Sequence, residues 1–592
     1  MPDAMHELGR WPAVGVMDLE RLGRPQIAAM VSDMLAIREP PEDLVSMLTR
    51  ESEGNPFFVA EYVRAAVAEG HLRRVRGRWQ ATIPSTTGES DRFSVGLPRK
   101  LRDLAQSRLR LVPDGATPLL EAAAVLGGDF DPRVASSIAD LGEEARLSAV
   151  ATLLKRKILE EQRGRLHFSH DKLREVAYSS LTPERRTTLH LEAARVIELR
   201  HTDGPDFSTF YPSLAHHWWQ GGDAARAVHY FDLAGSDALE RGAYRDAHTS
   251  LLRAEEIDPR AREAGAALRA ARRERLLCVA SFGIADLAGC IQHGREALLR
   301  LGRPLPRAPA EWWLSAGREL ARRALGPVTL GLRLPTPNET RERALEAALT
   351  YSQLATSFFF AGSSSRTLVA ILLGLRYGEK ARADRPIVDA CARLGFVTGT
   401  ARLRPVANHY FARARRGAER LGDPRARGIA LYFEAMHGIG LGDWEKTRKL
   451  GDRAAALLEE SGDAQEAEVA RTIAAHGFFY PGDVASADER VQQVLDTAMR
   501  RGNAQHTCWG RFLRARSELV RGRTAEALEL ARSALTLIED LPDTLSNVML
   551  EGTLALAALR AGQTDEALAA CQRLTTRLAR GESPGTGQCI DG

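Results

Sequence analysis

Four glycines recur at a fixed distance toward the C-terminal end of the chain. They lie 40 residues apart, at Gly442, Gly482, Gly522 and Gly562. A second series has the same period in another phase and consists of Gly422-Asp423, Gly462-Asp463, Gly502-Asn503 and Pro542-Asp543. Glycine can adopt the left-handed conformation that ends a helix, and Asp or Asn can then cap the next helix. Two boundaries in every 40 residues predict two helices in every repeat.

Such a repeat predicts an α-solenoid built from helical hairpins. The pattern is of the tetratricopeptide kind, with helices longer than those of the consensus of about 34 residues. In the stretch 522–538, apolar and small residues share one helix face: Ala527, Leu528, Ala531, Ala534, Leu535 and Ile538. The matching places 40 residues later are Ala567, Leu568, Cys571 and Leu574. We therefore expect Cys571 to be a buried packing residue.

The rest of the chain is also mostly helical in its pattern, so the predicted fold class is all-α. Residues 20–70 indicate three short helices, and 71–83 a turn or a small hairpin around Gly77. Further helices lead to a two-stranded wing that holds 161–169, an order typical of a winged helix. The predicted divisions are 1–84, a winged-helix domain at 95–185, first helical repeats at 186–324, and a solenoid at 341–592 that we expect to be incomplete at its C-terminus.

Composition excludes several classes of protein. A formal net charge of +4 over 592 residues gives no general reason to bind nucleic acid or an anionic membrane. The six cysteines form no C-x-x-C pair, so we expect neither a zinc site nor a disulfide framework, and a reducing cytoplasm fits best. No stretch has the apolar length of a membrane span or of a signal peptide.

We found no complete catalytic constellation. A G-x-x-x-x-G-K-[ST] loop is absent, since the chain has no Gly-Lys dipeptide. The spelling G-x-S-x-G occurs at 581–585, but it follows a helical stretch and we interpret it as a loop. His216 and His217 are adjacent and would point to different helix faces, which favours packing over metal binding. The basic cluster at 155–157 is too modest to favour direct recognition of DNA.

Several stretches resemble one known class of protein. Residues 51–70 (ESEGNPFFVAEYVRAAVAEG), 95–131 and 168–198 (beginning FSHDKLREVAY) resemble the region that follows the nucleotide-binding core of STAND-class signalling ATPases, members of the AAA+-like P-loop group. The repeat stretch 502–528 resembles the repeats of the same proteins. The resemblance is greatest to large bacterial regulators that join such a core to tetratricopeptide repeats, often with an adenylate cyclase or Ser/Thr kinase domain.

This resemblance implies a set of nucleotide-contacting residues. Segment 1–84 would be a remnant of the core followed by the helical lid, whose Gly-x-Pro motif would be Gly54, Asn55 and Pro56. The His-Asp motif of the winged helix would be His170, which approaches the β-phosphate of ADP, and Asp171, which caps the next helix. The alternative is that Ser169 and Asp171 cap the helix while His170 packs.

The chain departs from this class where the P-loop, the magnesium-binding strand and the core sheet should stand. Only MPDAMHELGR precedes WPAVGVMDLERLGRPQIAAMV. We therefore expect no enzyme activity and no tightly bound cofactor, with ATP or ADP belonging to the intact class, and we interpret the chain as a gene fragment or a split or degraded descendant. It would be a non-catalytic sensor and relay whose solenoid binds a protein, a peptide or a small ligand on its concave face, with oligomerisation left open. The alternatives are a stand-alone tetratricopeptide scaffold, an ATPase completed in trans, and a winged-helix DNA-binding regulator.

Overall fold

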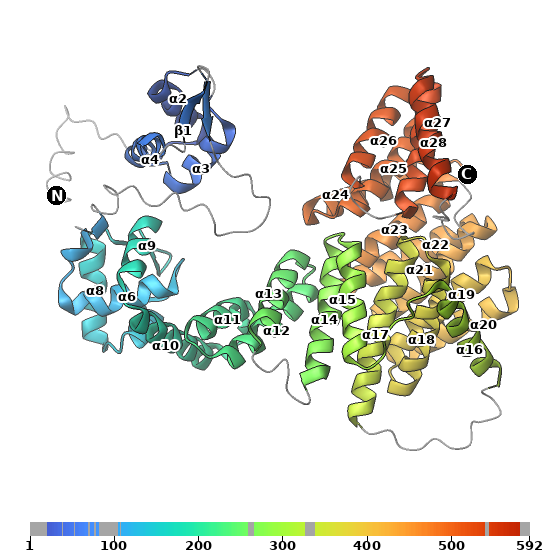
Figure 1. Cartoon of the computed structure of the whole chain (residues 1–592), viewed down its shortest axis with the longest axis horizontal. Helices are drawn as coiled ribbons and strands as arrows, with labels where there is room; N and C mark the ends of the chain where they lie inside the picture. The colour runs from blue at the N-terminus through green and yellow to red at the C-terminus, as the bar shows by residue number, and fades with distance from the viewer. Residues whose placement is uncertain are drawn as a thin grey trace. The chain divides into compact units, whose positions relative to one another are not determined.

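The computed structural model describes residues 21–37, 40–52, 54–68, 72–75, 78–81, 105–106, 108–258, 266–325, 338–538 and 544–579. The described elements are helices apart from two two-stranded hairpins, which confirms the all-α fold class (Figure 1). The chain divides into two compact units, one of Met1–Pro205 with Gln220–Gly222 and one of Asp206–Trp219 with Asp223–Gly592. Among the described residues, no helix combines the length and apolar character needed to cross a bilayer.

The first unit begins with an N-terminal segment of three helices and a hairpin. Ile27, Val31 and Leu48 are buried where the helices meet. Val75 pairs with Arg78 next to the turn of the antiparallel hairpin, as predicted for 71–83, although Gly77 lies outside the described residues. The elements are α2 (Arg24–Leu35), α3 (Glu42–Ser52), α4 (Pro56–Ala68), β1 (Leu72–Val75) and β2 (Arg78–Ala81).

The second part of this unit, called here the hairpin segment (111–201), contains helices around another short hairpin. Its strands pair antiparallel, with Gln162 opposite Arg165, where the sequence predicts a wing. Backbone hydrogen bonds of 2.9 Å in both directions join Leu166 to Phe130 and fix the hairpin to the segment before α7. The elements are η1 (Asp114–Ala116), α6 (Thr117–Leu126), α7 (Pro132–Ile138), α8 (Glu143–Lys155), β3 (Leu159–Gln162), β4 (Arg165–Phe168), α9 (Asp171–Ser180) and α10 (Pro183–His201).

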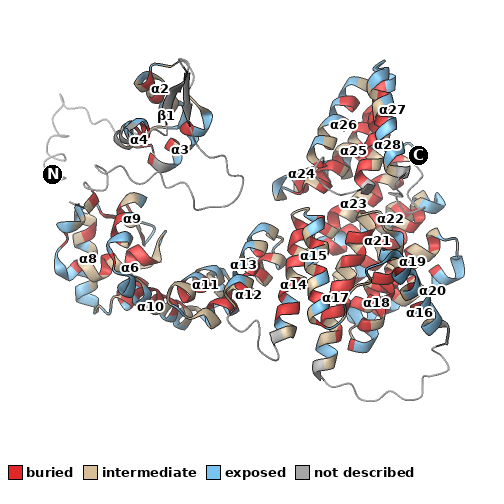
Figure 2. Ribbon diagram, viewed as in Figure 1, coloured by how far each residue is buried: buried red, intermediate tan, exposed pale blue. Residues whose placement is uncertain are grey.

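The second unit is a solenoid of antiparallel helix pairs. One continuous hydrophobic core runs from α14 to α23, and buried residues follow the faces where helices meet (Figure 2). The elements are η2 (Phe207–Phe210), α11 (Tyr211–Gln220), α12 (Ala224–Glu240), α13 (Tyr244–Ile257), α14 (Ala266–Gly283), α15 (Leu287–Arg300), α16 (Pro309–Leu325), α17 (Asn338–Phe360), α18 (Ser364–Ala381), α19 (Asp384–Thr400), α20 (Arg404–Leu421), α21 (Pro424–Leu441), α22 (Trp444–Glu460), α23 (Ala464–Phe479), α24 (Val484–Arg501), α25 (Ala504–Val520), α26 (Thr524–Ile538), α27 (Thr544–Arg560) and α28 (Thr564–Ala579).

The two 40-residue series mark helix boundaries, as predicted. The glycines of the first series have φ of 68°, 97°, 78° and 75° at Gly442, Gly482, Gly522 and Gly562. In the second series, Asp463 accepts a hydrogen bond from the backbone N–H of Glu466 at 3.2 Å, and Asn503 from that of His506 at 3.0 Å. Left-handed glycines therefore end helices, and short polar side chains cap the helices that follow. Pro542 and Asp543 lie outside the described residues.

The expected burial of Cys571 is wrong. Its side chain is exposed and Leu568 is 60% exposed, whereas Ala567 and Ala570 are buried. The same places on α26 are buried because that helix has neighbours on both sides. Helix α28 packs chiefly against α27, so its other side is not covered by a described helix. The position in the repeat alone therefore does not determine burial.

Candidate functional site

Gly54 lies in the turn between α3 and α4. Its φ is 77°, and a Cβ there would come within 2.6 Å of the carbonyl oxygen of Leu22. The backbone N–H of Leu22 donates to the carbonyl oxygen of Gly54 at 2.9 Å. Pro56 is exposed and is the first residue of α4, where the missing N–H costs no helical hydrogen bond. The turn therefore requires glycine and favours proline for local reasons, whatever their part in binding a nucleotide.

His170 and Asp171 lie at the start of α9. His170 is the residue before the helix, with extended backbone (φ −151°, ψ 131°), and its side chain does not cap the helix. Asp171 is in the first turn, where a negative charge interacts favourably with the helix dipole. Ser169 does not cap α9, because its hydroxyl donates to the carbonyl oxygen of Lys157 at 2.7 Å.

The structure brings the two predicted motifs close together through aromatic contacts. The ring of Phe58, on α4, meets the ring of His170 edge to face with centroids 4.5 Å apart. The Nζ atom of Lys172, on α9, lies 6.0 Å from the ring centroid of the buried Tyr62. Phe58 was not among the predicted site residues, yet it joins the stretch that holds Pro56 to the one that holds His170. The nucleotide-contacting roles of Gly54, Pro56, His170 and Asp171 remain predictions.

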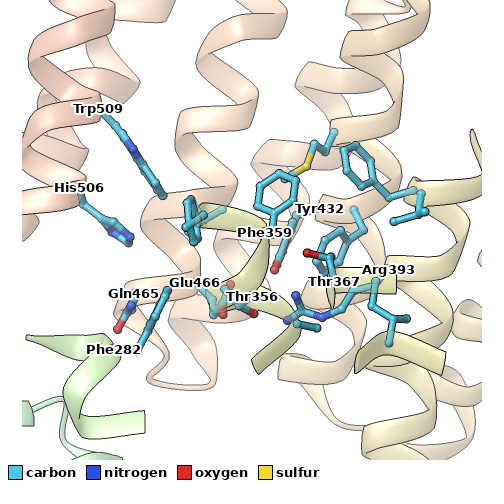
Figure 3. A pocket seen from close by; sticks show the side chains of 18 residues that line it. Phe282, Thr356, Phe359, Thr367, Arg393, Tyr432, Gln465, Glu466, His506 and Trp509 are labelled. Atoms are coloured by element: carbon cyan, nitrogen blue, oxygen red, sulfur yellow. The ribbon is translucent and has the colours of Figure 1, made fainter. Parts of the chain in front are cut away.

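A pocket lies within the solenoid, where the first helices of successive hairpins face one another (Figure 3). The cavity volume of the pocket is about 70 Å³. About 10–15 Å³ suffices for one water molecule, so the pocket has room for several. The lining of this aromatic pocket comes from α14, α17, α18, α19, α21, α23 and α25: Phe282, Ala355, Thr356, Phe359, Phe360, Thr367, Ile371, Arg393, Phe396, Val397, Tyr432, Phe433, Met436, Gln465, Glu466, Val469, His506 and Trp509.

The rings of the pocket form a connected network. Phe360 stacks on Trp509 with centroids 5.7 Å apart, and Trp509 stacks on His506 at 4.5 Å. Other pairs extend the network: Phe282–Phe360 at 6.0 Å, Phe359–Phe360 at 5.5 Å, Phe359–Phe396 at 6.4 Å, Phe396–Phe433 at 6.3 Å and Tyr432–Phe433 at 4.4 Å. These separations are those of favourable aromatic pairs. The pocket therefore offers ring faces and edges contributed by distant parts of the chain.

Charged groups surround the wall of the pocket that carries Glu466. Three carboxylates there each pair with an arginine: Asp389 with Arg393 at 3.1 Å, Asp463 with Arg425 at 2.7 Å, and Glu468 with Arg501 at 2.6 Å. His506 also pairs with Glu468, through Nδ1 at 2.6 Å. Glu466 makes no ion pair within 4 Å among the residues described. Its carboxyl group lies near the hydroxyl of Tyr432.

This environment shifts the protonation of two groups. Burial, with the charge of Asp463 adding to it, raises the pKa of Glu466 to about 7, although Arg425 and Arg393 act in the opposite direction. Burial and the neighbouring Glu466 raise the pKa of Tyr432 well above its usual value. Tyr432 therefore stays protonated and Glu466 is poised between its two forms near neutral pH. Perturbed ionisable groups in a concave pocket are typical of functional sites.

Comparison with known proteins adds three similar structures. No protein-family model matches the chain, and no curated protein matches its sequence. A signal transduction ATPase with numerous domains and a tetratricopeptide repeat sensor, from Pyrococcus horikoshii, matches 96% of this chain and 74% of its own at 11% identity, with a TM-score of 0.42. A Rap protein complexed with competence and sporulation factor matches 70% and 93% at 13% identity (TM-score 0.33), and Naa15/Naa10 bound to HypK-THB matches 64% and 65% at 16% identity (TM-score 0.18). With TM-scores below 0.5, none of these similarities bears on function.

The aromatic pocket was missed by sequence reasoning, which assigned a binding role to the concave face without naming residues there. The available signal was the aromatic run that ends at Phe360, in a chain with few aromatic residues. The two adjacent histidines lie in a helix of the second unit, α11. His217 and Trp218 are buried while His216 is exposed, so the adjacent histidines do point to different faces. Among the described residues, no cluster of His, Cys, Asp or Glu has the arrangement of a metal site.

Proposed function

We propose that this chain is the non-catalytic sensor and relay portion of a STAND-type regulatory protein. The aromatic pocket binds part of a protein, a peptide or a small ligand. The N-terminal segment and the hairpin segment pass the signal to a nucleotide-binding core. The observation that carries this proposal is the aromatic pocket itself, whose rings lie around Glu466, a carboxyl group with no ion-pair partner among the described residues.

The chemistry of the pocket suits recognition rather than catalysis. Apolar and aromatic walls supply affinity by burying apolar ligand surface, at roughly 25 cal/mol per Å². A few polar groups then fix the orientation of the ligand. The described lining includes no cysteine or serine, and its one histidine is held by Glu468. These features support a binding site in which the solenoid surrounds part of a ligand.

Selection from a random heptapeptide library tests the binding function. The full chain and its Trp509→Ala variant are immobilised in parallel, and the retained peptides are sequenced. We expect the wild-type chain to enrich a peptide family that the variant loses, because Trp509 stacks on both Phe360 and His506. Trp313→Ala is the matched control, since Trp313 is 61% exposed on α16 and does not line the pocket. Identical peptides from wild type and Trp509→Ala would contradict the assignment of the pocket.

Hydrogen exchange distinguishes a relay from a passive scaffold. The most enriched library peptide is added to the full chain, and exchange is followed by mass spectrometry. A relay predicts altered protection in 56–68 and 171–180, the helices joined by Phe58 and His170. A stand-alone scaffold predicts changes within the solenoid alone. Unchanged exchange in both helices would favour the scaffold and count against the relay.

Calorimetry with ADP tests the nucleotide half of the proposal. Phosphates bound in the intact class require a backbone cradle and a lysine, each charge-assisted bond contributing roughly 1.5–3 kcal/mol. These 592 residues contain no Gly-Lys dipeptide to begin such a loop. We expect no binding of ADP at micromolar concentrations. Micromolar affinity that disappears in His170→Ala would contradict this expectation and would show that His170 contacts the nucleotide without the core.

A further inference from the structure

The carboxylates around the aromatic pocket outnumber the arginines that pair with them among the described residues. Asp389, Asp463 and Glu468 are each matched by an arginine at 3.1 Å or less. Glu466 is the remaining carboxylate, and no cation among the described residues lies within 4 Å of it. When Glu466 is ionised, this part of the pocket therefore carries one negative charge that the surrounding side chains do not balance at close range.

Three other polar side chains of the lining are already engaged, those of Thr356, Thr367 and Arg393. The hydroxyls of Thr356 and Thr367 donate to carbonyl oxygens of their own helices at 3.5 Å and 2.8 Å. The guanidinium group of Arg393 is paired with Asp389 and lies 5.0 Å from the ring centroid of Phe433. Arg393 is therefore poorly placed to recruit an anion. Glu466, half-buried and facing the cavity, is the charged group that a ligand would meet.

The aromatic rings favour the same sign of charge. An aromatic face carries negative electrostatic potential and attracts ammonium groups, by about 2 kcal/mol when the pair is desolvated. Phe359, Phe360 and Trp509 belong to one connected ring network that lines the cavity. A carboxylate beside such rings is complementary to an organic cation. An anionic ligand would instead meet both the charge of Glu466 and the unfavourable ring faces.

We infer that the aromatic pocket selects an ammonium group attached to an apolar or aromatic body. The ammonium lies beside Glu466, and the body lies among the rings of Phe359, Phe360 and Trp509. This inference rests on the proposed function, because it names the ligand class of the same pocket. The ammonium can belong to a free amine or to a lysine next to an aromatic residue in a peptide, and the chemistry recognised is the same.

Saturation-transfer NMR and calorimetry with small probes test this selectivity. The full chain is titrated with phenethylamine, with 2-phenylethanol, which lacks the charge, and with 3-phenylpropionate, which reverses it. We expect phenethylamine to bind at least about tenfold more tightly than 2-phenylethanol, and 3-phenylpropionate to bind least. A second pair, acetyl-Gly-Phe-Lys-Gly-amide and its Gln analogue, shows whether a peptide presents the cation better than a free amine does. Binding of either amine-bearing probe with this preference supports the inference.

Two variants locate the selectivity. Glu466→Gln keeps the size and hydrogen-bonding capacity of the side chain and should reduce the preference for phenethylamine over 2-phenylethanol to near unity. Glu526→Gln removes a carboxylate that is 59% exposed and outside the pocket, and should leave the preference unchanged. If wild type binds 3-phenylpropionate as tightly as phenethylamine, or more tightly, the inference is overturned, although a binding pocket remains. A second outcome would overturn the inference and leave the proposed function standing. In it, Trp509→Ala loses the enriched library peptides, but wild type binds none of the cationic probes. If wild type binds neither probes nor library peptides, the proposed function itself fails.

The pH dependence of binding gives a readout that needs no variant. Glu466 is faced by Asp463, by Arg425 and Tyr432 of α21, by Arg393 and Asp389 of α19, and by Tyr244 of α13. Burial, together with these neighbouring charges, raises the pKa of Glu466 to about 7. The carboxyl group is therefore largely protonated at pH 6 and largely ionised at pH 8. Phenethylamine stays protonated over this range, so its affinity should rise about tenfold between these pH values, with proton release. An affinity independent of pH would contradict an ammonium beside Glu466.

Discussion

At the scale of single residues, Glu466 links protonation to the stability of the solenoid. Its pKa is about 7 in the folded chain, against an ordinary value near 4.5. Between these values the folded state holds a proton that the unfolded state has lost, so the free energy of unfolding falls as pH rises from about 4.5 to about 7. Glu466→Gln lacks this titration. We expect it to exceed wild type in stability by about 3 kcal/mol at pH 8, and by less than about 1 kcal/mol at pH 5.

Thermal unfolding by circular dichroism at pH 5 and pH 8 measures the difference. Other carboxyl groups titrate in the same range, but they are common to wild type and variant and cancel in the comparison. Glu526→Gln, on the exposed face of α26, is the control and should follow wild type at both pH values. If Glu466→Gln also follows wild type at both, the carboxyl group is solvated like an ordinary one.

Two glycines provide a matched test of the repeat boundaries. Gly522 has φ of 78°, Gly552 lies within α27, and a Cβ at either position would meet nothing within 4 Å. Only backbone conformation therefore separates them. Gly522→Ala should destabilise its region by about 1–2 kcal/mol, because alanine is strained at positive φ. Gly552→Ala should stabilise α27 by up to about 1 kcal/mol. Native-state hydrogen exchange measures the change in local stability at each position. If both substitutions stabilise or both destabilise their regions, the assigned boundary at Gly522 is contradicted.

At the scale of helices, an ionic cluster around a buried arginine joins three elements. Arg273 of α14 is 2% exposed and bonds to Asp232 of α12 at 2.7 Å and to Glu255 of α13 at 2.9 Å. Arg273→Met would leave the half-buried Asp232 and Glu255 without this partner, at a cost of up to about 3 kcal/mol. Hydrogen exchange in α12, α13 and α14 should show this loss together. The control is Arg241, which is 59% exposed and pairs with Asp237. Arg241→Ala should cost less than about 0.5 kcal/mol. Similar effects of the two changes would show that Arg273 is not structurally central.

The elements also show how far sequence patterns extend. The glycine and Asp/Asn series predicted helix ends because conformational preference at Gly442 or Asp463 is a local property. Burial depends on neighbours, so the repeat position of Cys571 did not predict its exposure. The aromatic pocket was out of reach for a related reason: Phe360 and Trp509 are far apart in sequence, and no periodic pattern says that they stack. Phe58 against His170 is likewise a contact between separate segments.

At the scale of the whole solenoid, distant repeats are joined through the pocket. A solenoid is usually quasi-one-dimensional, with each repeat contacting its neighbours. Here Phe360 of α17 stacks on Trp509 of α25, and the indole N–H of Trp509 donates to the hydroxyl of Ser546 on α27 at 2.7 Å. Helix α17 also contacts α27 directly. Stability of one repeat should therefore depend on repeats well removed from it in the chain, and the lining of the pocket itself comes from helices between α14 and α25.

Trp509→Ala tests this coupling. It removes the stacking with Phe360 and the hydrogen bond to Ser546, and aromatic pairs alone contribute roughly 0.5–1.5 kcal/mol beyond their buried area. We expect hydrogen-exchange protection to fall in α17 as well as in α25 and α27, because the change severs a contact between them. Trp509→Phe, which keeps a stacking ring, should restore most protection in α17 but less in α27. Trp313→Ala, at an exposed position, should change neither. If Trp509→Ala affects α25 alone, the repeats behave as independent neighbours, and a ligand in the pocket would have no route from one end of the solenoid to the other.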